Sequence, residues 1–251
     1  MKTANKILIG IIGGSGLDDP KILKDFTSTQ PQTPYGFPSS PITLGQIGGQ
    51  PVAIIARHGS KHDLPPTLVP YRANIWALKK IGCSHVLATT ACGSLRAKIK
   101  PGDLVFPDQF IDFTRLRPLT FFDYKVVHTS MASPFDAGLR RQLIEAADNL
   151  HFAYHPAGTV ITIEGPRFST KAESKLFRLW GADLINMSTV PEIVLANEIG
   201  LPYQSIAMST DYDCWKTNEA PVTFDMVMER MHSNADKVKH LLIDVVSSFS
   251  P

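Results

Sequence analysis

Short apolar runs rich in β-branched and aliphatic residues recur along the chain, and each is short enough to be a single buried strand. Between several of them, apolar residues return at helical spacing, as in residues 69–80 before Gly82 and residues 139–150. Strand–helix alternation predicts an α/β fold with a mostly parallel or mixed sheet covered by helices. The predicted strands are Ile7–Gly13, Val52–Ala56, His85–Thr90, Leu104–Ile111, Thr159–Ile163, Leu184–Met187 and Gln204–Met208.

Capping signals place the ends of two further helices. Thr170 with Glu173 and Thr189 with Glu192 have the spacing of a capping box, and glycines at 181 and 200 indicate where the helices end. The last predicted helix, Phe224–Val246, carries an apolar stripe that we assign to core packing: Val227, Met231, Val238, Leu242 and Val245. Residues 114–134 have no clear period and form a candidate functional loop.

Composition narrows the class of protein. A chain of 251 residues with 43% apolar composition can bury a sizeable core, and we expect one domain over residues 1–251. The net charge of +2 and the lack of a long basic run argue against a nucleic acid or membrane partner. No stretch has the length of a transmembrane span, and three cysteines without metal-type spacing suit a reducing compartment. We therefore expect a cytoplasmic location.

Polar residues follow one predicted strand after another. They are found at 13–16, 57–59, 89–94, 186–188 and 210–213. Since ligands of open α/β sheets gather at the carboxyl ends of the strands, these five segments are expected to form one site. The alternative is that the five segments are unrelated turns, in which case each would need a separate structural explanation.

The segment Gly13-Gly14-Ser15-Gly16 gives backbone amides room to approach an anion, and Ser15 adds a hydroxyl donor. A dinucleotide fingerprint is disfavoured because Asp19 stands where its next glycine is required. A plain tight turn remains an alternative for this segment.

Arg57 and His58 offer a planar charged fork for phosphate and a ring donor beside it, although a solvated arginine is the alternative. His58 and His62 stand four residues apart, but Gly59 lies between them and the glutamate of the zinc-protease motif is missing, so we expect no metal. Hydroxyls in 89–94 suit a second wall of the anion site or an ordinary strand exit. Cys92 has no identifiable base and is expected to be structural.

Asp211 and Asp213 are spaced so that two carboxylates on an extended segment point into one pocket. Such a pair is found in glycosidases, in metal sites and in sites that recognise a donor-rich base, and a solvated acidic turn is the alternative.

Taken together, these segments resemble the trimeric purine nucleoside phosphorylase family, in its branch that acts on 5′-methylthioadenosine. The resemblance extends from about Ile7 to Val246. It is carried by IGIIGGSGL at 9–17, ARHG at 56–59, NIWALK at 74–79, TTACGSL at 89–95, PDQFID at 107–112, IEGPRFS at 163–169, INM at 185–187 and STDYDCW at 209–215.

The resemblance implies a purine nucleoside phosphorylase fold with a mixed central sheet, a homotrimer and a role for each matching residue. Phosphate would be bound by Ser15, Arg57, His58, Thr90, Ala91 through its backbone, and Ser188. Met187 would contact the ribose, Phe168 the base and sugar, Asp211 the purine N7 and Asp213 the exocyclic amine, with Ser169 and Phe224 affecting specificity. His128 in the long loop would reach the 5′ substituent across a subunit boundary.

The implied reaction is reversible phosphorolysis of S-methyl-5′-thioadenosine to adenine and 5-methylthioribose 1-phosphate in purine and methionine salvage. Inorganic phosphate would be a co-substrate, and no metal or organic cofactor is expected. Serine at 15 and 188, where the family often has threonine, keeps the hydroxyl, whereas Phe224 replaces a smaller aliphatic residue and would reshape the 5′ pocket. The alternatives are a broader 6-amino- or 6-oxopurine nucleoside phosphorylase, a hydrolytic nucleosidase and a non-catalytic nucleoside sensor.

Overall fold

A computed structural model describes residues 8–13, 23–216 and 223–249, and the statements below concern these residues. They form one mixed sheet of eleven strands, in which eight follow the order β2-β3-β4-β1-β5-β10-β9-β7 and β11, β6 and β8 branch from β5. The strands are β1 (Leu8–Gly13), β2 (Lys24–Thr29), β3 (Ile42–Ile47), β4 (Gln50–Ala56), β5 (Cys83–Ser94), β6 (Leu104–Val105), β7 (Gln109–Phe113), β8 (Tyr154–His155), β9 (Thr159–Ile163), β10 (Leu184–Asn186) and β11 (Tyr203–Asp211).

Strand β5 is the centre of this sheet. Its first half pairs in parallel with β1 on one side, its length from Val86 to Gly93 pairs in parallel with β11, and its last residues pair with β10 in the antiparallel sense. Parallel strands carry their carboxyl ends to the same edge. The ends of β4, β5 and β11 therefore meet, and β10 joins them there.

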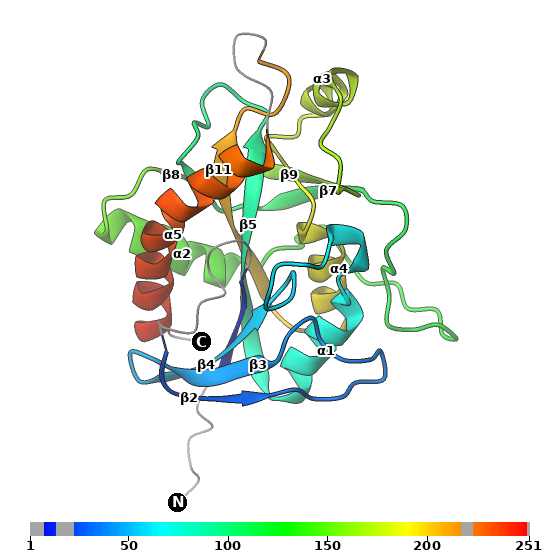
Figure 1. The fold of residues 1–251 in the computed structure, drawn as a ribbon, viewed down its shortest axis with the longest axis vertical. Coiled ribbons are helices and arrows are strands. Elements are labelled where there is room, and N and C mark those ends of the chain that lie inside the picture. The colour runs from blue at the N-terminus through cyan, green and yellow to red at the C-terminus, as the bar shows by residue number, and fades with distance from the viewer. Residues whose placement is uncertain (1–7, 14–22, 217–222, 250–251) are drawn as a thin grey trace, which may run out of the picture.

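Helices cover both faces of the sheet, with α2 and α5 on one side and α1 and α4 on the other (Figure 1). Their bounds are α1 (Tyr71–Lys80), α2 (Ala137–Asn149), α3 (Lys171–Leu179), α4 (Thr189–Glu198) and α5 (Phe224–Ser247). Each side buries its own apolar cluster, one including Ile75 and Ile193, the other Leu143 and Leu242. The predicted α/β class with a mixed, helix-covered sheet is confirmed.

The helix boundaries are confirmed in part. The Thr170–Glu173 capping box is present, and Gly181 and Gly200 follow α3 and α4 with φ of 90° and 61°. The predicted Thr189–Glu192 capping box is wrong. Ser188 is the N-cap residue of α4, no side chain caps it, and the Glu192 side chain is fully buried against Arg57.

Some strand predictions were also wrong. The apolar run Leu104–Ile111 is divided into β6 and β7, because Pro107 lacks a backbone donor and the chain changes partners there, from β8 and β11 to β9. Strands β2, β3 and β8 were not predicted. Residues 91–94, expected to follow the predicted strand His85–Thr90, lie within β5. Residues 114–134 contain no helix or strand.

Candidate active site

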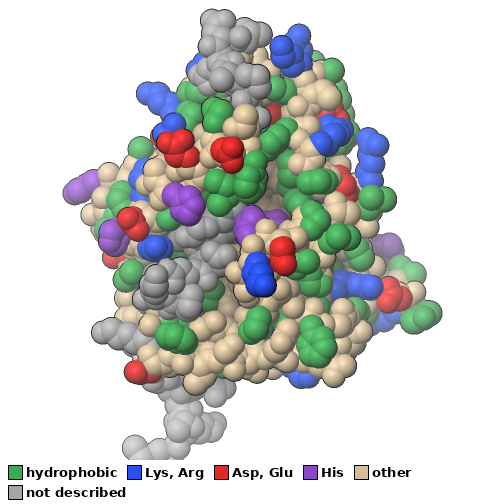
Figure 2. All heavy atoms as spheres, in the orientation of Figure 1, with side chains coloured by type: hydrophobic (Ala, Val, Ile, Leu, Met, Phe, Trp, Pro, Cys, Tyr) green, Lys and Arg blue, Asp and Glu red, His purple; other side chains and the backbone are tan. Residues whose placement is uncertain are grey.

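One cavity of about 400 Å³ lies at the edge where β4, β5, β10 and β11 end, and the start of α5 closes one side of it. Figure 2 shows a hollow near the centre of this face, with apolar and histidine side chains at its edge. The predicted site residues that line the cavity are Arg57, His58, Thr90, Ala91, Phe168, Ser169, Met187, Ser188, Asp211, Asp213 and Phe224. The structure thus brings together side chains that the sequence separates by more than a hundred residues.

Two predicted site residues are not among them. Ser15 lies outside the described residues. His128 is exposed in the long loop and does not line the cavity of its own chain. Val227, which we assigned to core packing, does pack against the apolar cluster that includes Leu242, and it also lines the cavity from the start of α5.

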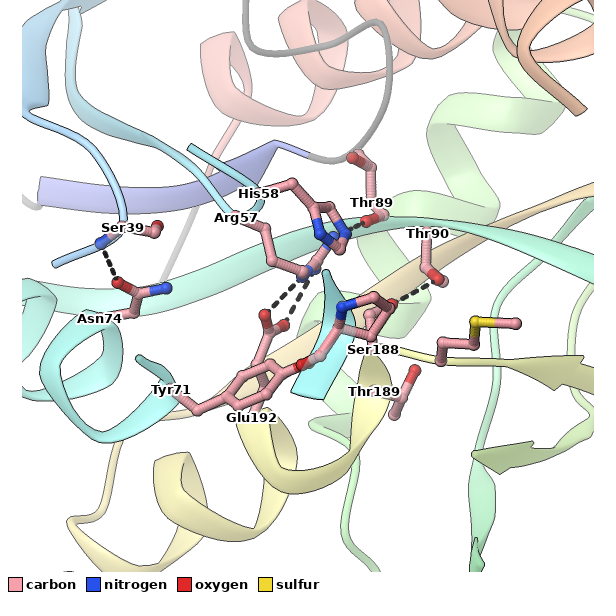
Figure 3. Close-up of polar contacts among 12 residues, drawn as sticks. Ser39, Arg57, His58, Tyr71, Asn74, Thr89, Thr90, Ser188, Thr189 and Glu192 are labelled. Atoms are coloured by element: carbon pink, nitrogen blue, oxygen red, sulfur yellow. Dashed lines mark hydrogen bonds and ion pairs between the residues drawn. The ribbon is translucent and has the colours of Figure 1, made fainter. Parts of the chain in front are cut away.

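Thr90 and Ser188 form one wall of the cavity. Their hydroxyl oxygens are 2.8 Å apart, one from β5 and one from the second residue after β10 (Figure 3). The Asn186 amide donates to Thr90 Oγ1 at 3.1 Å and to Thr189 Oγ1 at 2.7 Å, while its own oxygen accepts from Thr162. The Asn186 oxygen already accepts from Thr162, so its amide nitrogen is the donor to Thr90. The Thr90 hydroxyl can therefore donate its own proton to Ser188, to the Ala91 carbonyl or to a ligand.

Arg57 is almost fully buried and its guanidinium fork does not point freely into the cavity, contrary to expectation. Nε and Nη2 donate to the two carboxylate oxygens of Glu192, and Nη1 donates to the Thr89 carbonyl at 2.7 Å (Figure 3). Glu192 raises the pKa of Arg57 further above its usual value, although burial opposes this. Arg57 is one of the lining residues, so a cation held in a fixed orientation lies beside the cavity.

His58 also differs from expectation. Its Nδ1 lies 2.9 Å from the Leu64 carbonyl, which can only accept, so Nδ1 carries a proton. Burial, with the positive charge of Arg57 beside it, lowers the pKa of His58 to about 4. The ring is therefore neutral near pH 7, and its Nε2 is an acceptor there rather than the donor that we expected.

The two aspartates of the cavity are held by hydrogen bonds. Asp211 Oδ2 lies 2.7 Å from Thr210 Oγ1, and Oδ1 accepts from the Asp213 backbone N–H at 2.6 Å. Asp213 has φ of 50°, so the segment turns after Asp211 and is not the extended pair that we expected. Asp213 Oδ1 accepts from the Ser169 hydroxyl at 2.5 Å. Both carboxyl groups still line the cavity.

Met187 is positioned by a buried arginine from the long loop. Arg117 Nη1 donates to the carbonyls of Met187 and Val190 at 2.7 and 2.6 Å. Its Nε donates to Glu164, which also accepts from the backbone of residues 115 and 116. Phe168 and Phe224, in contrast, are 41% and 59% exposed and lie at the mouth.

Sequence reasoning missed three residues at this site. Glu192 was assigned to a helix cap, and Arg117 lies in a segment without periodicity that gave no signal. Thr210 was noticed only as part of the segment 210–213. Arg57 and Glu192 are 135 positions apart in the sequence. The sequence near Glu192 therefore does not indicate that it pairs with Arg57.

Within residues 8–13, 23–216 and 223–249, no group of three or more His, Cys, Asp or Glu side chains is arranged to hold a metal ion. Among the helices in the same part of the chain, none has the length and apolar content needed to cross a membrane.

The carboxyl edge of this α/β sheet thus holds a cavity lined by a hydroxyl pair, a buried arginine and a carboxyl pair. A family model described as the phosphorylase superfamily matches residues 8–247, so the chain belongs to that superfamily. Within it, the chain belongs with the S-methyl-5′-thioadenosine phosphorylases. It is 53% identical to the one from Danio rerio over 252 residues (98% of this chain, 90% of the relative) and 50% identical to the one from Drosophila melanogaster over 246 residues (96% and 85%).

Solved structures support the same family. Methylthioadenosine phosphorylase from Schistosoma mansoni in complex with adenine is 43% identical, with a TM-score of 0.93 and coverage of 96% of this chain and 91% of that one. The same enzyme in complex with tubercidin gives a TM-score of 0.89 at 42% identity, with coverage of 96% and 90%. The predicted family and purine nucleoside phosphorylase fold are confirmed, and the chain is an enzyme of the pentosyltransferase class.

Proposed function

We propose that this protein catalyses the reversible phosphorolysis of S-methyl-5′-thioadenosine to adenine and 5-methylthioribose 1-phosphate. The observation that carries the proposal is the placement of the Thr90–Ser188 hydroxyl pair and the Asp211–Asp213 carboxyl pair in one cavity of about 400 Å³. That volume suits a nucleoside-sized ligand. The similarity to relatives named for this reaction supports the same activity.

The phosphate would be bound by Thr90, Ser188, the Ala91 backbone, Arg57 and His58, with Ser15 completing the set. Arg57 supplies fixed positive charge beside the Thr90–Ser188 wall. The Nε2 atom of neutral His58 would accept from the hydroxyl of monohydrogen phosphate, because Nδ1 already donates to Leu64. Phosphate is a co-substrate in this proposal, and no metal or organic cofactor takes part.

The reaction needs charge stabilisation on both sides of C1′. As the C1′–N9 bond breaks, the sugar becomes cationic, and phosphate fixed next to it stabilises that charge before its oxygen bonds to C1′. Met187 would contact the ribose and Phe168 would cover the base and sugar. On the base side, a proton moves from Asp211 to N7, which lets the purine leave as neutral adenine.

Asp213 explains a preference for adenine. Its Oδ1 accepts from Ser169, and its remaining lone pairs would accept from the 6-amino group of the base. A 6-oxopurine presents an acceptor at the same place, and a site built around a buried hydrogen bond can reject such an analogue by roughly 10⁴-fold. Ser169 would therefore influence specificity through Asp213, and Phe224 would do so at the 5′ end of the cavity.

The family resemblance and the surface also support an assembly. We propose a cytoplasmic homotrimer of single-domain subunits spanning 1–251, in which His128 reaches a neighbouring cavity. The loop that carries His128 exposes several large apolar side chains, and burying them between subunits is favourable: Leu116, Leu119, Tyr124 and Val126. Sedimentation velocity tests the trimer, and a monomer at micromolar concentration would contradict it.

The activity is tested by following adenine release from methylthioadenosine in a phosphate-stripped buffer, with and without added inorganic phosphate. We expect release only with phosphate, together with a sugar 1-phosphate. Release without phosphate would make the protein a nucleosidase. Release from inosine at a comparable rate would indicate a 6-oxopurine phosphorylase, and no release from either would leave a binding protein. Replacement of Arg57 by alanine should raise the KM for phosphate far more than that for the nucleoside.

A further inference from the structure

Thr210 contacts Asp211 but has no role in the reaction as proposed above. Its side chain is buried, and its hydroxyl oxygen lies between two acceptor groups, 3.2 Å from the Cys92 carbonyl and 2.7 Å from Asp211 Oδ2. A threonine hydroxyl has one proton and can donate only one full hydrogen bond at a time. The two contacts therefore depend on where the Asp211 proton is.

The Cys92 carbonyl can only accept. If the Thr210 proton points to it, the contact with Asp211 is a hydrogen bond only when Oδ2 itself carries a proton and donates to Thr210. The other carboxyl oxygen, Oδ1, already accepts a hydrogen bond from the Asp213 backbone N–H at 2.6 Å. We therefore place the acid proton on Oδ2. When Asp211 is ionised, the Thr210 proton turns from Cys92 to Oδ2 instead.

We propose that Thr210 is a positioning residue that holds the acid proton on Asp211 Oδ2 before reaction and stabilises the carboxylate after the proton has left. This inference rests on the proposed phosphorolysis. While Asp211 is protonated, Thr210 donates to Cys92 and accepts from Oδ2. Once Asp211 is ionised, rotation about the Thr210 Cβ–Oγ1 bond supplies a donor to the new charge, without movement of the backbone.

The proton transfer conserves atoms and charge. The Oδ2–H group first turns from Thr210 Oγ1 to N7. The Oδ2–H bond then breaks and an N7–H bond forms, while the C1′–N9 electron pair passes into the purine. The electron pair of the O–H bond stays on Asp211 as carboxylate charge. A phosphate oxygen then bonds to C1′. Thr210 gives up no proton, and only the direction of its O–H bond changes.

Other titratable groups also face Asp211. Asp213 and Cys214 lie on the same segment, and the Cys92 thiol comes from β5. Four more groups that follow β4 line the same cavity: Arg57, His58, His62 and Asp63. The part of α5 that lines the cavity contributes Phe224 and Val227, neither of which titrates. A change at Thr210 leaves all of these groups in place, so a shifted pH profile would report the hydroxyl itself.

The test compares Thr210→Val with Thr210→Ser and with a control, Ser209→Ala. Ser209 is the adjacent buried hydroxyl, and its Oγ has no hydrogen-bond partner in the described part of the chain. For each variant, kcat is measured from pH 5 to 9.5 with saturating methylthioadenosine and phosphate, and thermal unfolding is recorded. Should Thr210→Val fold poorly, Thr210→Ala provides the same measurement.

Loss of a hydrogen bond to a charged group is expected to lower kcat by about 10- to 100-fold in Thr210→Val. Without that donor the carboxylate forms less readily, so the alkaline limb of the profile should move to higher pH by about one unit. Thr210→Ser should restore the wild-type limb, and Ser209→Ala should keep it. An unshifted limb in Thr210→Val overturns the inference. If the proposed function itself is wrong, the wild-type protein shows no phosphate-dependent adenine release at all.

Discussion

The guanidinium of Arg57 and the carboxylate of Glu192 form a two-point ion pair inside the protein, with Nε–Oε1 and Nη2–Oε2 distances of 2.5 and 2.9 Å and side chains 1% and 0% exposed. The Tyr203 hydroxyl donates to Glu192 Oε2 at 2.9 Å, and burial raises the pKa of Tyr203 well above its usual value. This pair fixes the orientation of the one arginine that lines the cavity, among the described residues.

Replacement of Glu192 by glutamine should destabilise the protein by about 3 to 5 kcal/mol, since it leaves the Arg57 charge buried without its partner. It should also raise the KM for phosphate about tenfold or more, because Arg57 is then free to turn. Urea unfolding and steady-state kinetics measure the two effects. Glu198→Gln, on the same helix and bonded to residues 120 and 121, is the control. Equal KM values for phosphate in Glu192→Gln and Glu198→Gln would contradict the role of Glu192 in orienting Arg57.

Asp213→Asn should relax the selectivity for the base. The asparagine amide can donate to a 6-oxo group, which the carboxylate cannot do. We expect the ratio of kcat/KM for inosine to that for adenosine to rise by roughly 10-fold or more, within the range that such buried hydrogen bonds control. Asp225→Asn, an exposed change at the start of α5, should leave the ratio unchanged. An unaltered ratio in Asp213→Asn would remove Asp213 from base recognition.

The lowered pKa of His58, about 4, links its burial to acid stability. An unfolded chain takes up a proton near the ordinary histidine pKa of about 6.5, whereas the folded protein does so only near 4, so stability is complete above pH 6.5 and falls as the pH drops. His58→Asn keeps an N–H for the Leu64 carbonyl but does not titrate. The wild type should lose roughly 2 to 3 kcal/mol more than this variant between pH 7.5 and 4.5 in urea unfolding. If the wild type and His58→Asn lose the same stability over this pH range, His58 does not contribute to the acid dependence of stability.

Phe224 should set the room available to the 5′ substituent. The ring lies at the mouth of the cavity and is 59% exposed. Phe224→Leu should improve kcat/KM for nucleosides with bulkier 5′ groups by about 10-fold relative to methylthioadenosine, the scale of a methylene-sized change in an apolar pocket. Met226→Leu, an exposed change on the same helix that does not line the cavity, is the matched control. If both variants show the same substrate range, Phe224 has no part in it.

Gly165 supports the Met187 side of the cavity. Its φ is 68°, and a Cβ there would lie 2.5 Å from Met187 Sδ. Gly165→Ala should therefore raise the nucleoside KM several-fold and destabilise the protein by about 1 to 3 kcal/mol. Gly181 has φ of 90° with nothing within 4 Å of an added Cβ, so Gly181→Ala should cost stability alone. A nucleoside KM that stays normal in Gly165→Ala would show that Met187 does not contact the ribose.

Interactions between residues close in the sequence made much of the fold predictable. The Thr170–Glu173 capping box, the glycines after α3 and α4 and the strand-length apolar runs other than Leu104–Ile111 act within a few residues, and these were placed correctly to within a few residues. The edge strand β2 and its neighbour β3 were missed because their alternation is weak, and most of β2 that can be described is exposed. Pro107 divided a continuous apolar run, and only the change of strand partners showed that it does so.

The sequence by itself determined the family, the α/β class and eleven of the residues that line the cavity, because motifs at strand ends converge where parallel strands share one edge. Only the tertiary structure decided what those residues can do. Glu192 engages the Arg57 fork, the Leu64 carbonyl fixes the His58 tautomer, and Thr210 stands between Cys92 and Asp211. Each of these depends on a hydrogen-bond partner brought in from elsewhere or on the direction of a single proton, and neither is written in residue type or spacing.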